Sequence, residues 1–196
     1  SKRGKPIVMF LGCYSGPIQK GEEAIRPLRE FAEPIADLSG KMSYLDVQTF
    51  LDPDYPDGQY YYWKSLYLPQ LSDASIAALV NHSARRPSPL SSVDIWGLGG
   101  AIERMEANAA PIAHRHAPFM LGLESNWLDE ERSEENVEWT RTVYDDMRRY
   151  SDGGSYLNFP GFAEEGDMVR KAYGDKYERL RRVKAKYDPD NVFQGN

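Results

Sequence analysis

Residues 91–100, SSVDIWGLGG, and residues 118–127, PFMLGLESNW, decide the fold. Each run is rich in aromatic and other apolar residues, which is typical of a strand, and Gly99 and Gly100 close the first run. The polar connection between the two runs contains no helical pattern. Neighbouring parallel strands require a crossover helix, so two consecutive strands without one favour an antiparallel pair. The centre of the sheet is therefore expected to be antiparallel.

Working outward from this pair, periodicity alternates between strand and helix along the chain. Apolar spacing predicts helices over residues 21–36, 72–83, 133–152 and 175–187, and strands over residues 6–14, 59–68 and 155–159. Ser72 is expected to cap the second helix. Pro27 is tolerated in the first helix only near its start. This mixed order predicts an α+β fold, with a large, mainly antiparallel sheet flanked by helices in one domain.

Composition excludes several classes of protein. Of 196 residues, 41% are hydrophobic and 28% are charged, which is typical of a folded globular chain. The net charge of -6 argues against a nucleic-acid partner. No apolar run approaches the roughly 18 to 20 residues that span a bilayer, so no membrane is expected and a cytoplasmic location is favoured. The single cysteine, Cys13, excludes an intrachain disulfide, and it falls in the predicted strand over residues 6–14, where burial is expected.

The familiar motifs of phosphate, dinucleotide, hydrolase and zinc-protease sites are missing from the sequence. Gly97, Gly99 and Gly100 have the wrong spacing for a dinucleotide loop and indicate a bent strand end. The run His114-Arg115-His116 is better interpreted as a loop arginine between solvated or packed histidines than as a metal cluster. No metal site is predicted.

Tyrosine-rich strands carry the remaining polar signal. The run YYYW at residues 60–63, with Tyr67, is able to line a ligand pocket or to pack helices onto the sheet. Because neighbours in a strand point to opposite faces, at most half of these rings can enter one site. Tyr156 and Asn158 are two apart on a predicted strand and share a face, which suits a polar site or a structural cross-strand pair equally well.

Several segments together resemble the berberine-bridge-enzyme-like FAD-linked oxidases, which are flavoproteins of the vanillyl-alcohol-oxidase type. The most specific is YGDKYERLRRVKAKYDPDNVF at 173–193, whose pattern YxRLxxxKxxYDPxNxF is close to a signature of that family's C-terminus. The others are YYYWKS at 60–65, RRPSPLSSVDIWGLGGAI at 85–102, IAHRHAPFMLGLESNW at 112–127 and SYLNFPG at 155–161. The resemblance covers most of the chain.

The resemblance implies that residues 1–196 are a substrate-binding domain, with a C-terminal berberine-bridge-like segment over about 150–196 and without the N-terminal FAD-binding domain. It implies an FAD-dependent oxidoreductase that transfers hydride to flavin from a hydroxyl-bearing sugar, alcohol or secondary metabolite. The flavin supplies the redox chemistry. This chain alone is therefore expected to be inactive and not to retain FAD.

The resemblance also implies roles for individual residues. Tyr156 is the expected catalytic residue, taking the proton of the substrate hydroxyl, and Arg115 is a candidate for the positive charge that favours its phenolate. Asn158 and Asn191 are expected near the flavin. Gly122 stands where relatives often carry Gln or Glu, which suggests room for a bulkier substrate. The residues expected to bind substrate are Tyr62, Trp96, Met120, Gly122 and Glu124.

Two other functions stay open from the sequence. One is a stand-alone α+β module that binds a small aromatic or glycosylated ligand without a cofactor, and the other is a structural or dimerisation domain. In the oxidoreductase interpretation the expected partners are a small-molecule substrate and the missing FAD domain. Self-association is also expected, through the face around Tyr156 and Phe159 that would otherwise meet that domain.

Overall fold

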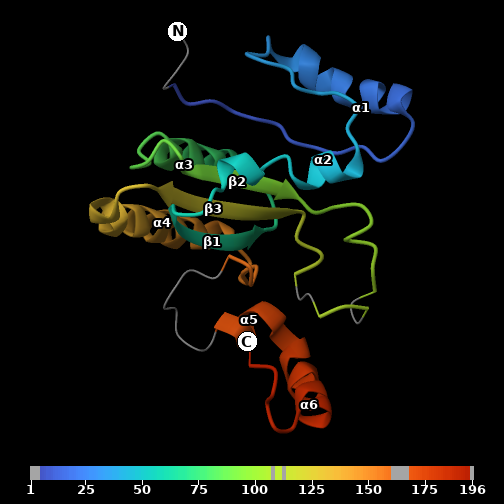
Figure 1. Ribbon diagram of the computed structural model, residues 1–196, viewed down its shortest axis with the longest axis vertical. Coiled ribbons are helices and arrows are strands. Elements are labelled where there is room, and N and C mark those ends of the chain that lie inside the picture. Colours follow the sequence, from blue (N-terminus) through green and yellow to red (C-terminus); the bar gives the residue numbers. More distant parts are fainter. Residues whose placement is uncertain (1–4, 107–108, 112–113, 160–167, 195–196) are drawn as a thin grey trace. The chain divides into compact units, whose positions relative to one another are not determined.

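A computed structural model of the chain describes residues 5–106, 109–111, 114–159 and 168–194 (Figure 1). The chain divides into two compact units, Ser1–Asp57 and Gly58–Asn196. Both units lack a helix long and apolar enough to cross a membrane in the part of the chain that the structure describes.

The first unit holds three short helical segments. They are α1 (Ile18–Phe31), α2 (Tyr44–Gln48) and the 3-10 turn η1 (Asp52–Asp54). A capping box between Ser43 and Asp46 begins α2, since each side chain accepts a hydrogen bond from the other residue's backbone amide. Pro27 lies well inside α1 rather than near its start, so that prediction was wrong. The helix is exposed along its length, where water can replace the hydrogen bond that the proline removes.

The strand predicted over residues 6–14 is wrong. These described residues form no strand, the side chains from Ile7 to Leu11 are 59–84% exposed, and Cys13 is exposed rather than buried. A β-favouring pattern expresses the fit of side chains to a pleated surface, and it does not itself supply the backbone partner that a strand needs. Residues 6–14 have the β-favouring pattern, but among the described residues they pair with no neighbouring strand.

The second unit is built on three antiparallel strands (Figure 1). These are β1 (Tyr60–Leu68), β2 (Ser92–Gly97) and β3 (Phe119–Trp127), in the order β1-β3-β2. The direct pairing of β2 with β3 confirms the antiparallel reading of the two consecutive strands, and the α+β class is confirmed with them.

Two helices pack against one face of this sheet. They are α3 (Asp73–Ser83) and α4 (Ser133–Met147), the latter placed between the 3-10 turns η2 (Glu130–Arg132) and η3 (Arg148–Tyr150). Ser72 caps α3 as predicted, because its hydroxyl accepts the backbone N–H of Ser75. Alternate strand residues meet the helices in one buried cluster of Leu66, Leu68, Leu79, Leu121, Leu123, Trp139, Val143 and Met147.

The C-terminal part contains α5 (Met168–Tyr173), the 3-10 turn η4 (Gly174–Lys176) and α6 (Tyr177–Tyr187). Asp188 ends α6, and its carboxylate accepts the backbone N–H groups of Val192 and Phe193. The strand predicted over residues 155–159 is wrong, because the amide of Phe159 donates to the carbonyl of Tyr156 and closes a turn. Residues 155–159 are held by hydrogen bonds to the side chain of Ser65 and not by pairing as a fourth strand of the sheet.

Removing a leucine from the buried cluster is expected to destabilise this unit strongly. Leu121 is fully buried at the centre of β3. Leu121→Ala should lower the free energy of unfolding by about 2–5 kcal/mol, because it removes apolar contact and leaves a cavity. Urea unfolding followed by circular dichroism measures the change. Leu128→Ala is the matched control, since Leu128 is 67% exposed, and an equal loss in both variants would contradict the placement of the core.

A buried lysine on the same face is expected to make stability depend on pH. Lys64 is 4% exposed, with its ammonium 3.8 Å from the centre of the Tyr144 ring. Burial lowers the pKa of Lys64 to about 8; the charge of Asp145 opposes this shift, and those of Arg141 and Arg148 add to it. Between that value and the ordinary pKa near 10.4, the unfolded chain binds more protons than the folded chain. The free energy of unfolding should therefore rise from pH 8 to about pH 10, by on the order of 1–3 kcal/mol.

The control for that rise is Lys64→Met, which keeps the length of the side chain and removes the titrating group. Urea unfolding of both proteins at pH 7, 8, 9 and 10 isolates the contribution of Lys64 from that of the tyrosines. The difference between the two proteins should change across this window. Parallel curves would show that Lys64 does not titrate there.

Candidate functional site

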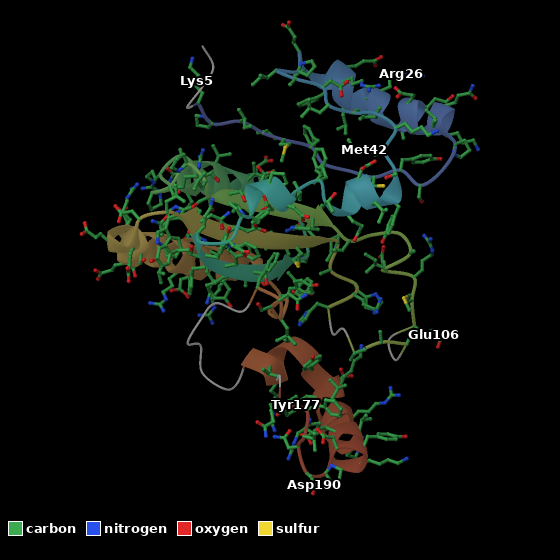
Figure 2. All side chains as sticks on the ribbon, in the orientation of Figure 1. Lys5, Arg26, Met42, Glu106, Tyr177 and Asp190 are labelled. Atoms are coloured by element: carbon green, nitrogen blue, oxygen red, sulfur yellow. The ribbon has the colours of Figure 1, made fainter. Side chains whose placement is uncertain are left out.

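The face of the sheet opposite α3 and α4 carries most of the residues predicted to bind substrate. The strand registers pair Tyr67 with Met120, Trp96 with Met120, and Asp94 with Gly122, and paired residues in a sheet share a face. We call this surface the second face; it consists of Trp63, Ser65, Tyr67, Asp94, Trp96, Met120, Gly122 and Glu124. Side chains cover both sides of the strands (Figure 2).

The turn of residues 155–159 docks on this second face through Ser65 of β1. The amide of Tyr156 donates to Ser65 Oγ at 2.8 Å, and the hydroxyls of Ser65 and Ser155 lie 3.1 Å apart. The ring of Phe159 packs edge-on against Trp63, with ring centres 5.2 Å apart. Backbone and ring contacts together fix the turn, so the position of Tyr156 is set by β1.

Tyr156 and Asn158 contact each other within this turn. The side-chain amide of Asn158 donates to the phenol oxygen of Tyr156 at 2.8 Å. A donor on that oxygen stabilises negative charge there and leaves the phenol proton free to point elsewhere. Tyr156 is 36% exposed, so a ligand can reach its oxygen. The turn brings Tyr156 and Asn158 into contact; they do not share one face of a strand, as the sequence pattern suggested.

Gly122 explains how the turn approaches the sheet. A Cβ built at Gly122 would lie 3.5 Å from the Phe159 ring and 3.6 Å from Cβ of Asp94. The space that was expected to admit a bulkier substrate is therefore filled by Phe159. A longer side chain at this position would displace that ring, so Gly122 admits the turn rather than a ligand.

A pair of carboxyl groups lies beside Gly122. Asp94 on β2 is hydrogen-bonded to Glu124 on β3, and the hydroxyl of Ser92 donates to Asp94 at 3.2 Å. Burial raises the pKa of Asp94, while the hydrogen bonds from Glu124 and Ser92 act in the opposite direction. Glu124 is 3% exposed. Two carboxyl groups in such contact can hold one proton between them, which makes the pair a candidate proton acceptor.

Sequence reasoning missed Asp94. A signal was present, because aspartate is depleted in strands and Asp94 stands in the middle of the apolar run SVDIWG. The register that brings Glu124 to the neighbouring position on β3 is a property of the folded sheet.

Tyr67 adds a second phenol to the same surface. It is buried, the ring of His114 stacks on it with centres 4.9 Å apart, and it packs with Ala117 and Met120. Burial, and after it the neighbouring Tyr156, raises the pKa of Tyr67. The two phenols are thus electrostatic neighbours, and Tyr67 is held in its neutral form.

Two predicted residues lie apart from this group. Tyr62 is on the helix-covered face, where it is 3% exposed and its phenol oxygen accepts a hydrogen bond from Arg141 Nε at 3.2 Å. Asn191 follows α6 with a positive φ of 52°, and its amide donates to the carbonyl of Asp188. Among the described residues, no contact joins Asn191 to the turn. The packing interpretation thus holds for Tyr62.

The second face is more exposed at the edge strand β2 than at the central strand β3. Trp96 is 48% exposed, whereas Met120 is buried against Tyr67. The described ranges hold no group of three histidine, cysteine, aspartate or glutamate side chains placed as metal ligands.

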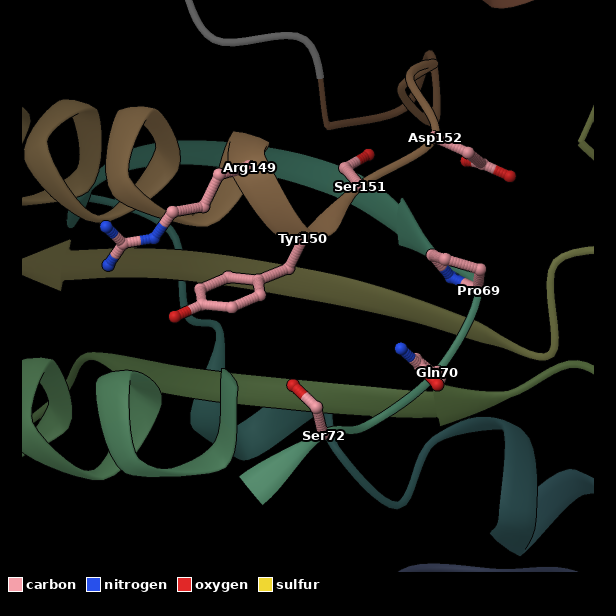
Figure 3. A pocket seen from close by; sticks show the side chains of 7 residues that line it. All are labelled: Pro69, Gln70, Ser72, Arg149, Tyr150, Ser151 and Asp152. Carbon is pink, nitrogen blue, oxygen red and sulfur yellow. The ribbon is translucent and has the colours of Figure 1, made fainter. Parts of the chain in front are cut away.

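A surface pocket lies elsewhere, at the end of β1 (Figure 3). It has a volume of about 280 Å³ and is lined by Pro69, Gln70, Ser72, Arg149, Tyr150, Ser151 and Asp152. None of the residues predicted to act on substrate lies in it. The second face is the better candidate site, because it carries Asp94 and Glu124 and because the turn with Tyr156 and Asn158 docks on it.

Comparisons with known proteins show which family the chain resembles. The family model "Berberine and berberine like" matches residues 155–196, the segment that begins with the docked turn. The FAD-linked oxidoreductase YgaK of Bacillus subtilis is 27% identical over 186 residues, covering 94% of this chain and 41% of that protein. An FAD-linked oxidoreductase of Dictyostelium discoideum is 23% identical over 191 residues, covering 96% and 41%.

Solved structures show the same fold. An oxidoreductase that catalyses the terminal step of gilvocarcin biosynthesis, solved with pregilvocarcin, matches with a TM-score of 0.67 and 25% identity, over 88% of this chain and 40% of that one. The berberine-bridge-enzyme-like protein 1 of Physcomitrella patens matches with a TM-score of 0.71 and 19% identity, over 92% and 42%. The resemblance to this family is confirmed, and the chain spans 41% of the length of the first curated relatives that it matches.

Proposed function

We propose that this chain, a relative of the berberine-bridge-enzyme-like FAD-linked oxidoreductases, is the substrate-binding part of an enzyme that oxidises a hydroxyl-bearing substrate with FAD. One observation carries the proposal: the contact between Asn158 and the Tyr156 phenol, on a turn docked beside the Asp94–Glu124 carboxyl pair. This arrangement places a proton acceptor at an accessible surface of the segment that the family model matches.

Each residue has a role in the proposed reaction. Oxidation of a secondary alcohol to a ketone removes one proton from oxygen and one hydride from carbon. Tyr156 Oη takes the proton as the hydroxyl loses it, and the hydrogen bond from Asn158 holds that oxygen in position. Asp94 and Glu124 hold a further proton close to the site. When FAD is bound, it supplies the acceptor for the hydride.

The exposed, polar edge of the turn suits the proposed cofactor. Tyr156 and Asn158 present a phenol and an amide at the surface, which are groups that can contact a flat polar ring. Asn191 stays a proposed second contact. Trp96 and Met120 are proposed to bind the substrate, with Trp96 offering an exposed aromatic surface.

Relatives suggest the class of substrate. One solved structure is named chitooligosaccharide oxidase, and another is a glycopeptide hexose oxidase in complex with teicoplanin. Sugars and glycosylated secondary metabolites are therefore the first substrates to test on a longer protein that contains this chain.

The chain of 196 residues is expected to purify without flavin, because the family's glycine-rich pyrophosphate-binding loop is not among its residues. A longer protein that joins it to a flavin-binding domain should be yellow, and an oligosaccharide or glycoside should bleach its flavin under anaerobic conditions. Absorbance at flavin wavelengths after gel filtration, followed by anaerobic titration, measures both. A stoichiometric flavin on the short chain would contradict the division of roles, and a longer flavoprotein inert to every hydroxyl-bearing substrate would contradict the proposed reaction.

A further inference from the structure

Arg115 is a buried guanidinium that forms no ion pair with the residues that the structure describes. It lies in the loop between β2 and β3 and is 7% exposed. Its Nη1 donates to the sulfur of Met105 at 3.2 Å, and its Nε is buried without a hydrogen-bond partner. Among the residues that the structure describes, no carboxylate forms an ion pair with it.

Such a site is incomplete on physical grounds. Arginine keeps its charge at any accessible pH, so burial cannot be relieved by loss of a proton. A thioether is a weak, uncharged acceptor and satisfies little of a group with five N–H donors. A buried charge is retained in proteins when a partner of opposite charge and good geometry compensates it. The planar fork of the guanidinium matches the paired oxygens of a phosphate or a carboxylate.

The surroundings hold the guanidinium in place. The amide of Ala117 donates to the carbonyl of His114, which closes a turn around Arg115. Ala117 is buried, and the ring of His114 stacks on the buried Tyr67. The apolar wall excludes water and strengthens any charge interaction made there.

We propose that Arg115 binds an oxyanion, the phosphate or carboxylate group of a small-molecule ligand, at the turn of residues 114–117. The proposal does not depend on the proposed oxidation. Binding to the chain of 196 residues therefore tests it without flavin or turnover.

The experiment uses inorganic phosphate and acetate as probes, with chloride at the same ionic strength as the reference. Thermal unfolding and isothermal titration calorimetry are compared for the wild type, Arg115→Gln, Arg115→Lys and Arg104→Gln. Arg104 is the matched control because it is an exposed arginine of the same loop. Phosphate or acetate should stabilise the wild type and Arg104→Gln, and affinity should fall at least about tenfold in Arg115→Gln, the scale of one lost charge-assisted bond. The stronger of the two anions identifies the ligand group.

Arg115→Lys keeps the charge without the fork, so it should bind more weakly than the wild type and more strongly than Arg115→Gln. In chloride alone, Arg115→Gln should unfold at the wild-type temperature or above it, because it removes an uncompensated buried charge. The proposal is overturned if neither anion binds the wild type more tightly than chloride does, or if Arg115→Gln binds both anions as well as the wild type. A large loss of stability of Arg115→Gln in chloride would overturn it too, by showing that the arginine is already paired within the chain.

Discussion

Replacing Tyr156 with phenylalanine, in a longer protein that joins this chain to a flavin-binding domain, is expected to slow flavin reduction by substrate about 10²–10⁴-fold. The substitution removes the oxygen that accepts the substrate proton and keeps the ring that packs edge-on against Phe159. Loss of one hydrogen bond in the bound ground state should weaken substrate binding by only about 0.5–1.5 kcal/mol. Anaerobic stopped-flow measurement of flavin bleaching against substrate concentration separates the two effects.

The control is Tyr60→Phe, since Tyr60 is 37% exposed, close to the 36% of Tyr156, and stacks on Trp127 away from the second face. It should leave the bleaching rate unchanged. If Tyr156→Phe kept a rate within about threefold of the wild type, far from the range expected of a general base, Tyr156 would be a structural residue.

The chemical case for Tyr156 rests on Asn158 more than on Arg115. The amide of Asn158 donates to the phenol oxygen, whereas the recorded donor contact of Arg115 goes to Met105. The expectation that Arg115 supplies the charge for a phenolate therefore has no contact to support it. Asn158→Ala should slow the same step by less than Tyr156→Phe does, because it removes a neutral donor and leaves the acceptor in place.

The sequence predicted the three paired strands correctly and two further strands wrongly. The runs at 91–100 and 118–127 became paired antiparallel strands because each had a neighbour close in sequence. Residues 6–14 and 155–159 show similar β-favouring patterns, yet neither segment forms a strand in the structure. Pattern reports which side chains suit a pleated surface, and pairing depends on backbone partners that only the folded chain supplies.

The site was predicted in part for the same reason. Alternation correctly limited the aromatic residues to half per face, but it could not say which half, because a shift of one residue exchanges the faces. Tyr62 consequently lies under α4, and Trp63 lies on the second face. The resemblance implied room for a bulkier substrate at Gly122, whereas in the structure this position lies against Phe159, a residue 37 positions later that the turn brings within contact distance.

Asp94→Asn in the same longer protein is expected to lower the rate of flavin reduction by about 10²-fold, the lower end of what positioned proton transfer contributes. The amide has the shape of the carboxyl group but cannot accept a proton from its partner Glu124. Because the pKa of Asp94 is raised, the wild-type rate should fall on the acid side at a higher pH than an exposed aspartate would give, and Asp94→Asn should abolish that limb. Bleaching rates from pH 4 to pH 8 measure this, with Asp152→Asn, at an exposed position, as the control.

Stability separates this chemical role from a structural one. A carboxyl group whose folded pKa is raised stabilises the fold below its unfolded pKa, and that contribution is lost as pH rises through the folded pKa. At neutral pH, Asp94 in the wild type is therefore a cost to the fold, and Asp94→Asn should unfold at the wild-type temperature or above it. A variant that is slow and at least as stable as the wild type can have lost only proton transfer. A variant as fast as the wild type would show that Asp94 takes no part in the reaction, and one that is slow because it unfolds would show that the Asp94–Glu124 pair instead holds the strands together.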